Sequence, residues 1–155
     1  MFDRITAFGI IVTILSVSLP AQSQSCTSLA LVGGEGSEVE KTVSVPTVPG
    51  PFGVRITRNN WNTDWLVPSG QLFKSFAATI VSPEGGVFDI RMYLKYSDET
   101  EDKFYDVNNS RLNAGEPLEI RATPRNNEQP YQVNLFVGEA DNIGKSYRAS
   151  VVGCL

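Results

Sequence analysis

Hydrophobic and polar residues alternate along much of this 155-residue chain. The clearest example is segment 87–96, in which every second residue is apolar and the residues between them are mostly polar. One face would carry Phe88, Ile90, Met92, Leu94 and Tyr96. A spacing of two predicts a β-strand with one buried face. The same alternation predicts strands at 118–123, 131–137 and 147–151, and less regular strands are predicted at 28–32, 38–45, 53–58 and 72–81.

Glycine and proline separate these segments. Thirteen glycines and nine prolines leave few stretches in which a helix could run without interruption. Turn-forming clusters occur at 33–34, 49–51, 68–70, 83–86 and 113–115. About eight short strands with regular turns between them indicate an all-β fold. We predict a single antiparallel β-sandwich, jelly-roll-like in its strand spacing.

The first 25 residues have a different character. Residues 5–19 form an apolar run, which is shorter than the roughly 20 residues of a transmembrane helix. Pro20 ends the run, and small residues follow it. This pattern is typical of a helical signal peptide, residues 1–25, followed by one domain, residues 26–155. We therefore predict an exported protein, secreted or periplasmic, with no stable membrane anchor after cleavage. An uncleaved anchor and a lipid-modified Cys26 are the alternatives.

Two cysteines frame the predicted domain, Cys26 at its start and Cys154 next to its end. In an oxidising compartment an even number of cysteines favours pairing. A disulfide between them requires Cα atoms within about 7 Å of each other. We therefore expect the first and last strands to be neighbours in one sheet or to face each other across two. Two free thiols or an intermolecular bridge are the alternatives.

Composition excludes several chemistries. The chain has no histidine, which rules out Ser-His-Asp and Cys-His catalysis and histidine-based metal sites. A net charge of −4, without a run of lysines or arginines, indicates no binding to nucleic acid or anionic lipid. We predict that the protein is not an enzyme and holds no cofactor or metal. The acidic segment 98–102 leaves two interpretations open, a calcium site and a solvated hairpin.

The densest polar and aromatic segment is 59–65. Its candidate ligand-binding residues are Asn60, Trp61, Asn62, Asp64 and Trp65. Two tryptophans four residues apart share a face of a strand or a helix. Flat indoles beside amide and carboxylate groups suit a sugar, whose apolar faces stack on rings while its hydroxyls form hydrogen bonds. In the competing interpretation both indoles cap the core under a long loop.

The phenylalanines are assigned to the core, with one exception. The core set is Phe52, Phe73, Phe76, Phe88 and Phe104. Phe136 differs because it lies on the face opposite Val133 and Leu135. We interpret it as a filler of the far side of the sheet or as part of a contact patch.

Three functions are compatible with these features. The first is a non-catalytic protein of the cell envelope or extracellular space that acts through surface contacts with a protein partner. The second is a small carbohydrate- or polymer-binding module that uses Trp61 and Trp65. The third is a hydrolase with paired carboxylates, although nothing in the sequence singles out a pair. An exposed tryptophan pair beside a groove would favour the second function over the first.

Overall fold

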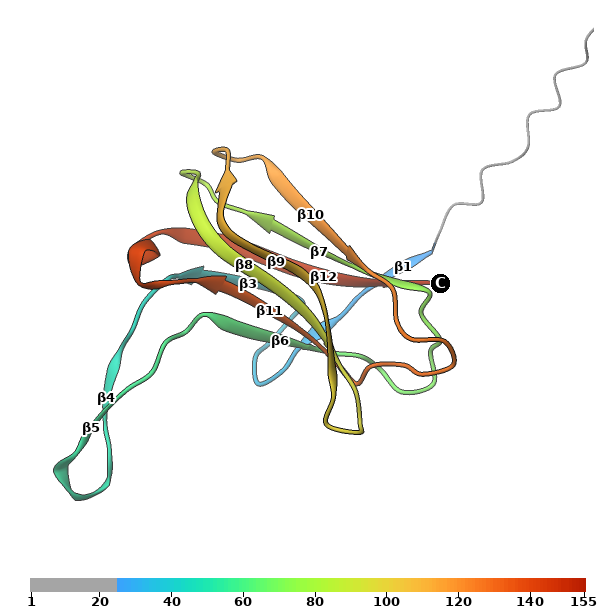
Figure 1. Cartoon of the computed structure of the whole chain (residues 1–155), viewed down its shortest axis with the longest axis horizontal. Coiled ribbons are helices and arrows are strands. Elements are labelled where there is room, and N and C mark those ends of the chain that lie inside the picture. Colours follow the sequence, from blue (N-terminus) through green and yellow to red (C-terminus); the bar gives the residue numbers. More distant parts are fainter. Residues whose placement is uncertain (1–24) are drawn as a thin grey trace, which may run out of the picture.

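The computed structural model describes residues 25–155, so the predicted signal peptide, apart from Ser25, lies outside the described residues. Figure 1 shows two β-sheets packed face to face, and a narrow two-stranded ribbon that projects from one end of them. Within residues 25–155 no helix has the length and apolar character needed to cross a bilayer.

Five strands form each sheet. The first sheet has the order β1–β12–β7–β10, and β3 also pairs with β12. Its strands are β1 (Cys26–Ser28), β3 (Glu38–Thr42), β7 (Ser75–Val81), β10 (Pro117–Ala122) and β12 (Ser146–Cys154). The second sheet has the order β2–β6–β11–β8–β9. Its strands are β2 (Ala30–Leu31), β6 (Asn62–Leu66), β11 (Gln132–Gly138), β8 (Gly86–Lys95) and β9 (Glu101–Leu112). All these pairings are antiparallel, which confirms the predicted all-β sandwich.

The projecting ribbon consists of residues 44–60. Its strands β4 (Thr47–Pro49) and β5 (Arg55–Thr57) pair with each other and belong to neither sheet. The short 3₁₀ turn η1 (Pro51–Gly53) forms its tip, and a second 3₁₀ turn, η2 (Ala140–Asn142), precedes β12.

The described residues thus contain twelve strands where about eight were predicted. The predicted strand 28–32 divides between the two sheets at the buried Leu29. The long strand β9 is exposed on most of both faces, so it lacks the alternation that marks a half-buried strand. The additional strands are therefore short segments and edge strands.

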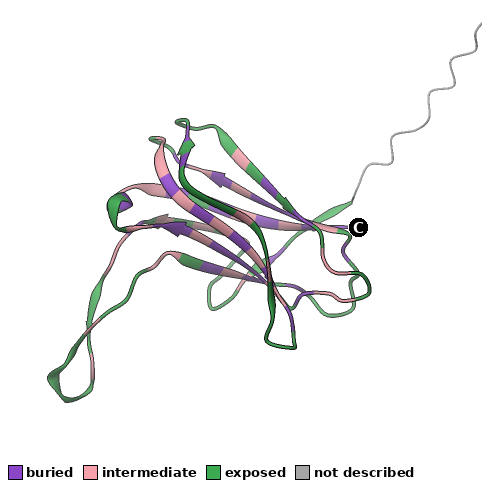
Figure 2. Ribbon diagram, in the orientation of Figure 1, coloured by how far each residue is buried: buried purple, intermediate pink, exposed green. Residues whose placement is uncertain are grey.

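The core lies between the two sheets, as the alternating buried residues of Figure 2 show. The predicted core face of β8 is confirmed, because Phe88, Ile90, Met92, Leu94 and Tyr96 are all completely buried. Removal of such side chains from water provides most of the favourable free energy of folding. The opposite side of the second sheet is consequently directed to solvent.

Two phenylalanines assigned to the core are exposed. Phe52 lies at the tip of the ribbon and is fully exposed, and Phe104 on the edge strand β9 is 38% exposed. The prediction for Phe52 is wrong because the alternation pattern does not reveal that this hairpin leaves the body of the sandwich. Phe73 and Phe76 are both buried, as predicted, with ring centroids 5.5 Å apart.

The predicted disulfide is confirmed. Cys26 and Cys154 are bonded, and their Cα atoms lie 4.0 Å apart. The two residues are paired directly across β1 and β12, so the first and last strands are neighbours in one sheet. The bond closes a loop with a sequence separation of 128 residues.

Candidate ligand-binding face

The five candidate residues of segment 59–65 occupy different environments. Along β6 the burial alternates, so that Thr63 and Trp65 point into the core while Asn62 and Asp64 point to solvent. Asn60 and Trp61 precede the strand, at the base of the ribbon. The structure therefore divides these residues among the core, the ribbon base and the outside of the sheet.

Trp65 is a core residue. Its side chain is 0% exposed. Its indole N–H donates a hydrogen bond to the carbonyl oxygen of Ser37 at 2.9 Å, which satisfies the one polar group of the buried ring. Trp65 therefore has no surface on which a ligand can stack.

Trp61 lies between the ribbon and the sandwich and is partly exposed. Its ring packs nearly perpendicular to that of Phe136, with centroids 5.7 Å apart. A Cβ atom at Gly138 would lie 2.6 Å from the indole, so the ring fits there only because the residue beneath it is glycine. The two indoles do not form one exposed platform, since the first packs over the end of β11 and the second lies inside the core.

Asn60 closes the base of the ribbon. Its side-chain amide donates to the carbonyl oxygen of Thr42 at 2.8 Å, and its side-chain oxygen accepts from the backbone N–H of Ser44 at 2.9 Å. Lys41 adds a second tie by donating to the carbonyl oxygens of Asn60 and Asn62 at 3.1 and 2.8 Å. Burial lowers the pKa of Lys41, although nearby Asp64 opposes this shift. Asn60 therefore has a structural role in this arrangement.

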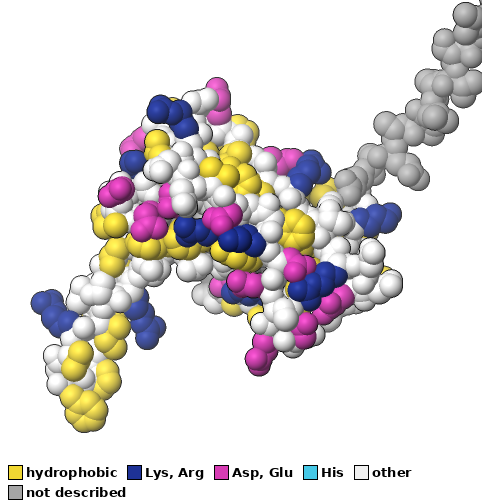
Figure 3. Space-filling view, viewed as in Figure 1, with side chains coloured by type: hydrophobic (Ala, Val, Ile, Leu, Met, Phe, Trp, Pro, Cys, Tyr) yellow, Lys and Arg dark blue, Asp and Glu magenta, His cyan; other side chains and the backbone are white. Residues whose placement is uncertain are grey.

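The solvent-facing side of β6, β11, β8 and β9, called the outer face below, carries three cross-strand rows of side chains. The first row is Leu66, Gln132, Lys95 and Glu101; the second is Asp64, Asn134, Tyr93 and Lys103; the third is Asn62, Phe136, Arg91 and Asp106. In Figure 3 basic and acidic side chains lie close together over the middle of the molecule, where Figure 1 places β8 and β9. Two of the candidate residues, Asn62 and Asp64, belong to this face.

Most of the charged side chains on the outer face are paired. The Lys95 ammonium donates to Asp64 at 3.1 Å, and the Asn134 amide donates to the same carboxylate oxygen at 2.8 Å. Arg91 donates to Asp106 at 3.0 Å, and Lys103 donates to the other oxygen of that carboxylate. The three rows contain three basic and three acidic residues, so their formal charges cancel.

Hydrogen bonds from Lys103, and then from Arg91, hold the pKa of Asp106 below its ordinary value. The same pairing with Asp106 raises the pKa of Lys103. Both groups are therefore charged at neutral pH, and Asp106 lacks the proton that a general acid must donate. These side chains act as fixed hydrogen-bonding groups.

Two aromatic rings lie among these polar groups. Phe136 pairs with Arg91 across β11 and β8, and Tyr93 follows two residues later on β8. The two residues are thus diagonal neighbours, and such positions lie about 7–8 Å apart in a sheet. The Arg91 guanidinium lies 4.5 Å from the centre of the Phe136 ring, which fixes one side of that ring. Tyr93 is partly exposed and has polar neighbours in its row.

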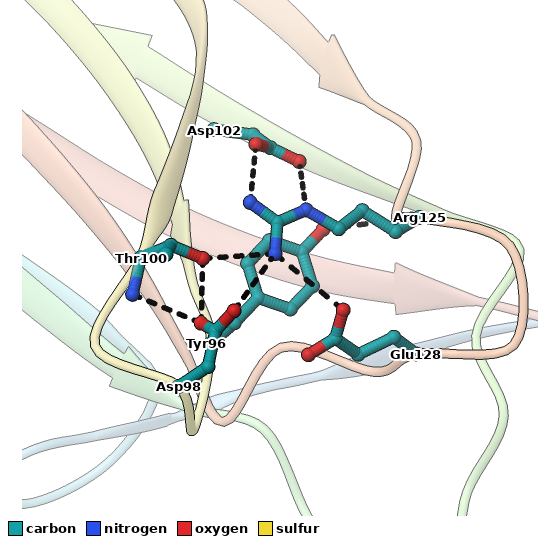
Figure 4. Close-up of polar contacts among 6 residues, drawn as sticks. All are labelled: Tyr96, Asp98, Thr100, Asp102, Arg125 and Glu128. Atoms are coloured by element: carbon teal, nitrogen blue, oxygen red, sulfur yellow. Dashed lines mark hydrogen bonds and ion pairs between the residues drawn. The ribbon is translucent and has the colours of Figure 1, made fainter.

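The acidic segment 98–102 is organised by an arginine rather than arranged as a metal site. Figure 4 shows Arg125 among five side chains of the β8–β9 turn and its own loop. Two of its nitrogens donate to the two oxygens of Asp102 at 2.9 and 2.7 Å. Its guanidinium also lies 4.0 Å from the centre of the Tyr96 ring and donates to Thr100 at 2.8 Å. Among residues 25–155 no group of three carboxylate or cysteine side chains is arranged to hold a metal.

We expect this cluster to make stability sensitive to acid. Hydrogen bonds from Thr100 lower the pKa of Asp98, and hydrogen bonds from Arg125 lower that of Asp102. A carboxyl whose folded pKa is lowered stabilises the fold above its ordinary pKa, and this contribution is lost as the pH falls through the folded value. The melting temperature of the Arg125→Gln variant should therefore lie below that of the natural protein at pH 6, and the gap should narrow towards pH 3.

The matched control is Arg121→Gln, which removes an ion pair between two well-exposed side chains, Arg121 and Glu119. This change should lower the melting temperature little at either pH. A gap for Arg125→Gln that stays constant between pH 6 and pH 3 would contradict the proposed linkage.

Sequence reasoning identified part of the outer face. It placed Asn62 and Asp64 near a ligand and marked Phe136 as an exception to the core pattern. It did not connect Phe136 with Arg91, Tyr93 and Lys95, which alternate with the core residues of β8. The missing information was the register that places β8 beside β11, because this pairing joins segments about 40 residues apart in the chain.

Comparisons with known proteins give a structural likeness only. No family model and no curated protein sequence matches the chain. A mutant of a family 29 carbohydrate-binding module complexed with mannohexaose is similar with a TM-score of 0.45 and 10% identity, over 85% of this chain and 92% of that one. A structure described as a carbohydrate-binding module of family 29 gives a TM-score of 0.43 and 10% identity, over 85% and 89%. At this level of identity the likeness concerns the β-sandwich alone.

Proposed function

We propose that this chain is an exported, non-catalytic binding domain that holds a neutral oligosaccharide on its outer face. The observation that carries the proposal is the set of three cross-strand rows, in which paired charged groups, amides and two aromatic rings lie side by side. Export is supported by the disulfide, which is typical of oxidising compartments.

The paired charges favour a neutral ligand. Asp64, Lys95 and Asn134 already form a hydrogen-bonded group, and its members are partly or largely buried. A charged ligand would have to displace one member of such a pair. Sugar hydroxyls can instead donate to the free lone pairs of the carboxylates and accept from the remaining N–H groups. The site is thus preorganised for a polyhydroxylated ligand of no net charge.

The aromatic rings favour a sugar over other neutral polar ligands. An aromatic ring attracts the apolar C–H face of a pyranose while its polar neighbours bind the hydroxyls. Tyr93, at the centre of the second row, is the partly exposed ring placed to do this. The four strands span about 14 Å between β6 and β9, which suits several linked sugar units.

The proposal is tested with an array of neutral oligosaccharides, followed by titration calorimetry of the natural protein and two variants. We expect Tyr93→Ala to weaken binding at least about tenfold, as expected for an aromatic residue at the centre of a binding surface. Tyr131→Ala is the matched control, because Tyr131 is an exposed tyrosine that precedes β11 and lies outside the three rows. If Tyr93→Ala binds the oligosaccharide unchanged and keeps its melting temperature, the outer face is not the binding site.

A protein partner is the second candidate function. It is favoured by Phe104 and Val107, which are both 38% exposed on the edge strand β9 next to the outer face. Exposed apolar residues on a sheet edge are a common feature of protein contacts. A blank oligosaccharide array would favour this candidate over the first.

A further inference from the structure

The tip of the ribbon is an apolar surface that contributes nothing to the core. Phe52 is fully exposed, and Val48 and Val54 beside it are 41% and 60% exposed. In Figure 3 the end of the ribbon is a hydrophobic surface, with basic side chains on both sides above it. Isolated exposed apolar residues are common, but several together at the end of a projecting segment mark a contact site.

The backbone at the tip directs Phe52 away from the protein. Its φ and ψ angles are 58° and 27°, in the left-handed region that non-glycine residues rarely adopt. A hydrogen bond of 2.6 Å from the Gly50 N–H to the Val54 carbonyl oxygen closes the loop around it. A bulky residue in a disfavoured conformation, fully exposed to water, does not serve the stability of the isolated domain.

The ribbon also has its own charge. Arg55 and Arg58 are the charged residues of segment 42–63, which contains no acid. Since the whole chain has a net charge of −4 and the ribbon contributes two positive charges, the remainder carries −6. The arginines follow the apolar tip by a few residues, so the ribbon has an apolar end and basic sides.

The length of the ribbon separates the two kinds of charge. Phe52 follows Ser44 by eight positions, which corresponds to about 25 Å of extended chain. The Debye length at physiological ionic strength is about 8 Å, so a negative surface at the tip is screened from the acidic body. The average charge of the chain, which argues against anionic lipid, therefore does not describe the ribbon.

We propose that the ribbon is a peripheral membrane-binding element that inserts its tip into the headgroup region of an anionic bilayer. Phe52 and Val54 would lie at the boundary of the acyl chains, and Arg55 and Arg58 would contact the anionic headgroups. Apolar insertion combined with basic flanking residues is the physical basis of reversible attachment to a membrane surface. The proposal is independent of the oligosaccharide site.

A second copy of the chain fits this tip less well. An apolar recess lined by residues such as Val67, Leu72 and Tyr131 could accept a phenyl ring. No acidic residue is among those that line this recess, so it offers Arg55 and Arg58 no charge partner. An anionic lipid surface supplies such partners and is therefore the better match for the tip.

The test is flotation of the mature chain with vesicles of phosphatidylcholine alone or mixed with phosphatidylglycerol. We use Phe52→Asn because asparagine tolerates the left-handed conformation, so the backbone of the tip is retained. The partition coefficient of this variant into the mixed vesicles should be lower than that of the natural protein by about tenfold or more. Arg55→Gln and Arg58→Gln should each lower the partition coefficient about fivefold. Added NaCl should abolish the difference between these two variants and the natural protein.

Leu72→Asn is the matched control, because Leu72 is 76% exposed but lies outside the ribbon. It should float as the natural protein does, and so should Tyr93→Ala, which separates this test from that of the outer face. Equal flotation of Phe52→Asn and the natural protein would overturn the proposal. So would self-association in sedimentation velocity that Phe52→Asn abolishes while vesicle binding is absent.

Discussion

Replacement of Trp65 by alanine should lower the free energy of unfolding by about 3–5 kcal/mol. The side chain is completely buried and its strand neighbours are Leu31 and Val133. Loss of the indole removes a large apolar surface and leaves a cavity that a close-packed sandwich fills only in part. It also leaves the Ser37 carbonyl oxygen without its N–H donor. Urea unfolding of the purified domain, monitored by tyrosine fluorescence, measures this loss.

Trp61→Ala is the matched control within the same segment. Trp61 is partly exposed and packs against the ring of Phe136, so its loss should cost about 1–2 kcal/mol. Its indole nitrogen is buried without a hydrogen-bond partner among residues 25–155, so no polar contact is lost with the ring. Equal and small losses for the two variants would mean that Trp65 is not packed as described.

The strands with one buried face could be predicted from the sequence. In β8 the alternation of apolar and polar residues is a direct consequence of core on one side and water on the other, and the prediction gave the correct face. The edge strand β9 could not be found in this way. Most of its residues are exposed on both sides, so nothing in their order reflects the strand conformation.

The projection of the ribbon could not be predicted from the sequence either, for a different reason. The turn at residues 49–51 was predicted, and η1 begins at Pro51. An apolar residue in a hairpin, however, has the same sequence pattern whether the hairpin lies on the core or projects from it. Phe52 was therefore assigned to the core, and a net charge averaged over the chain concealed the two arginines behind the tip.

The candidate site, too, could be predicted only in part from the sequence. The sequence placed sugar-binding chemistry at segment 59–65 because aromatic and polar residues are close together there. The fold turns Trp65 inward and leaves Asn62 and Asp64 outside, because neighbouring residues of a strand point to opposite faces. The aromatic residues that the outer face offers instead, Tyr93 and Phe136, come from strands that are remote in sequence and adjacent in the sheet.

The second large effect is expected when the disulfide is removed. Cys26 and Cys154 join the ends of the domain across a sequence separation of 128 residues. In the chain-entropy model a loop of this size restricts the unfolded state by roughly 5 kcal/mol, and measured losses are about 2–5 kcal/mol. The double variant Cys26→Ala, Cys154→Ala should lose stability within this range.

Loss of the disulfide should also loosen strand β1, in addition to lowering the stability of the whole domain. Strand β1 has only three residues, all exposed, and pairs with β12 alone. Without the bond, few buried contacts hold this strand in the sheet, so its amide protons should exchange at a rate close to that of an unstructured segment. The amides of the central strand β7, which pairs on both sides with β12 and β10, provide the internal comparison. A double variant that unfolds within about 1 kcal/mol of the natural protein and retains slow exchange in β1 would show that the strand pairing alone holds the two ends together.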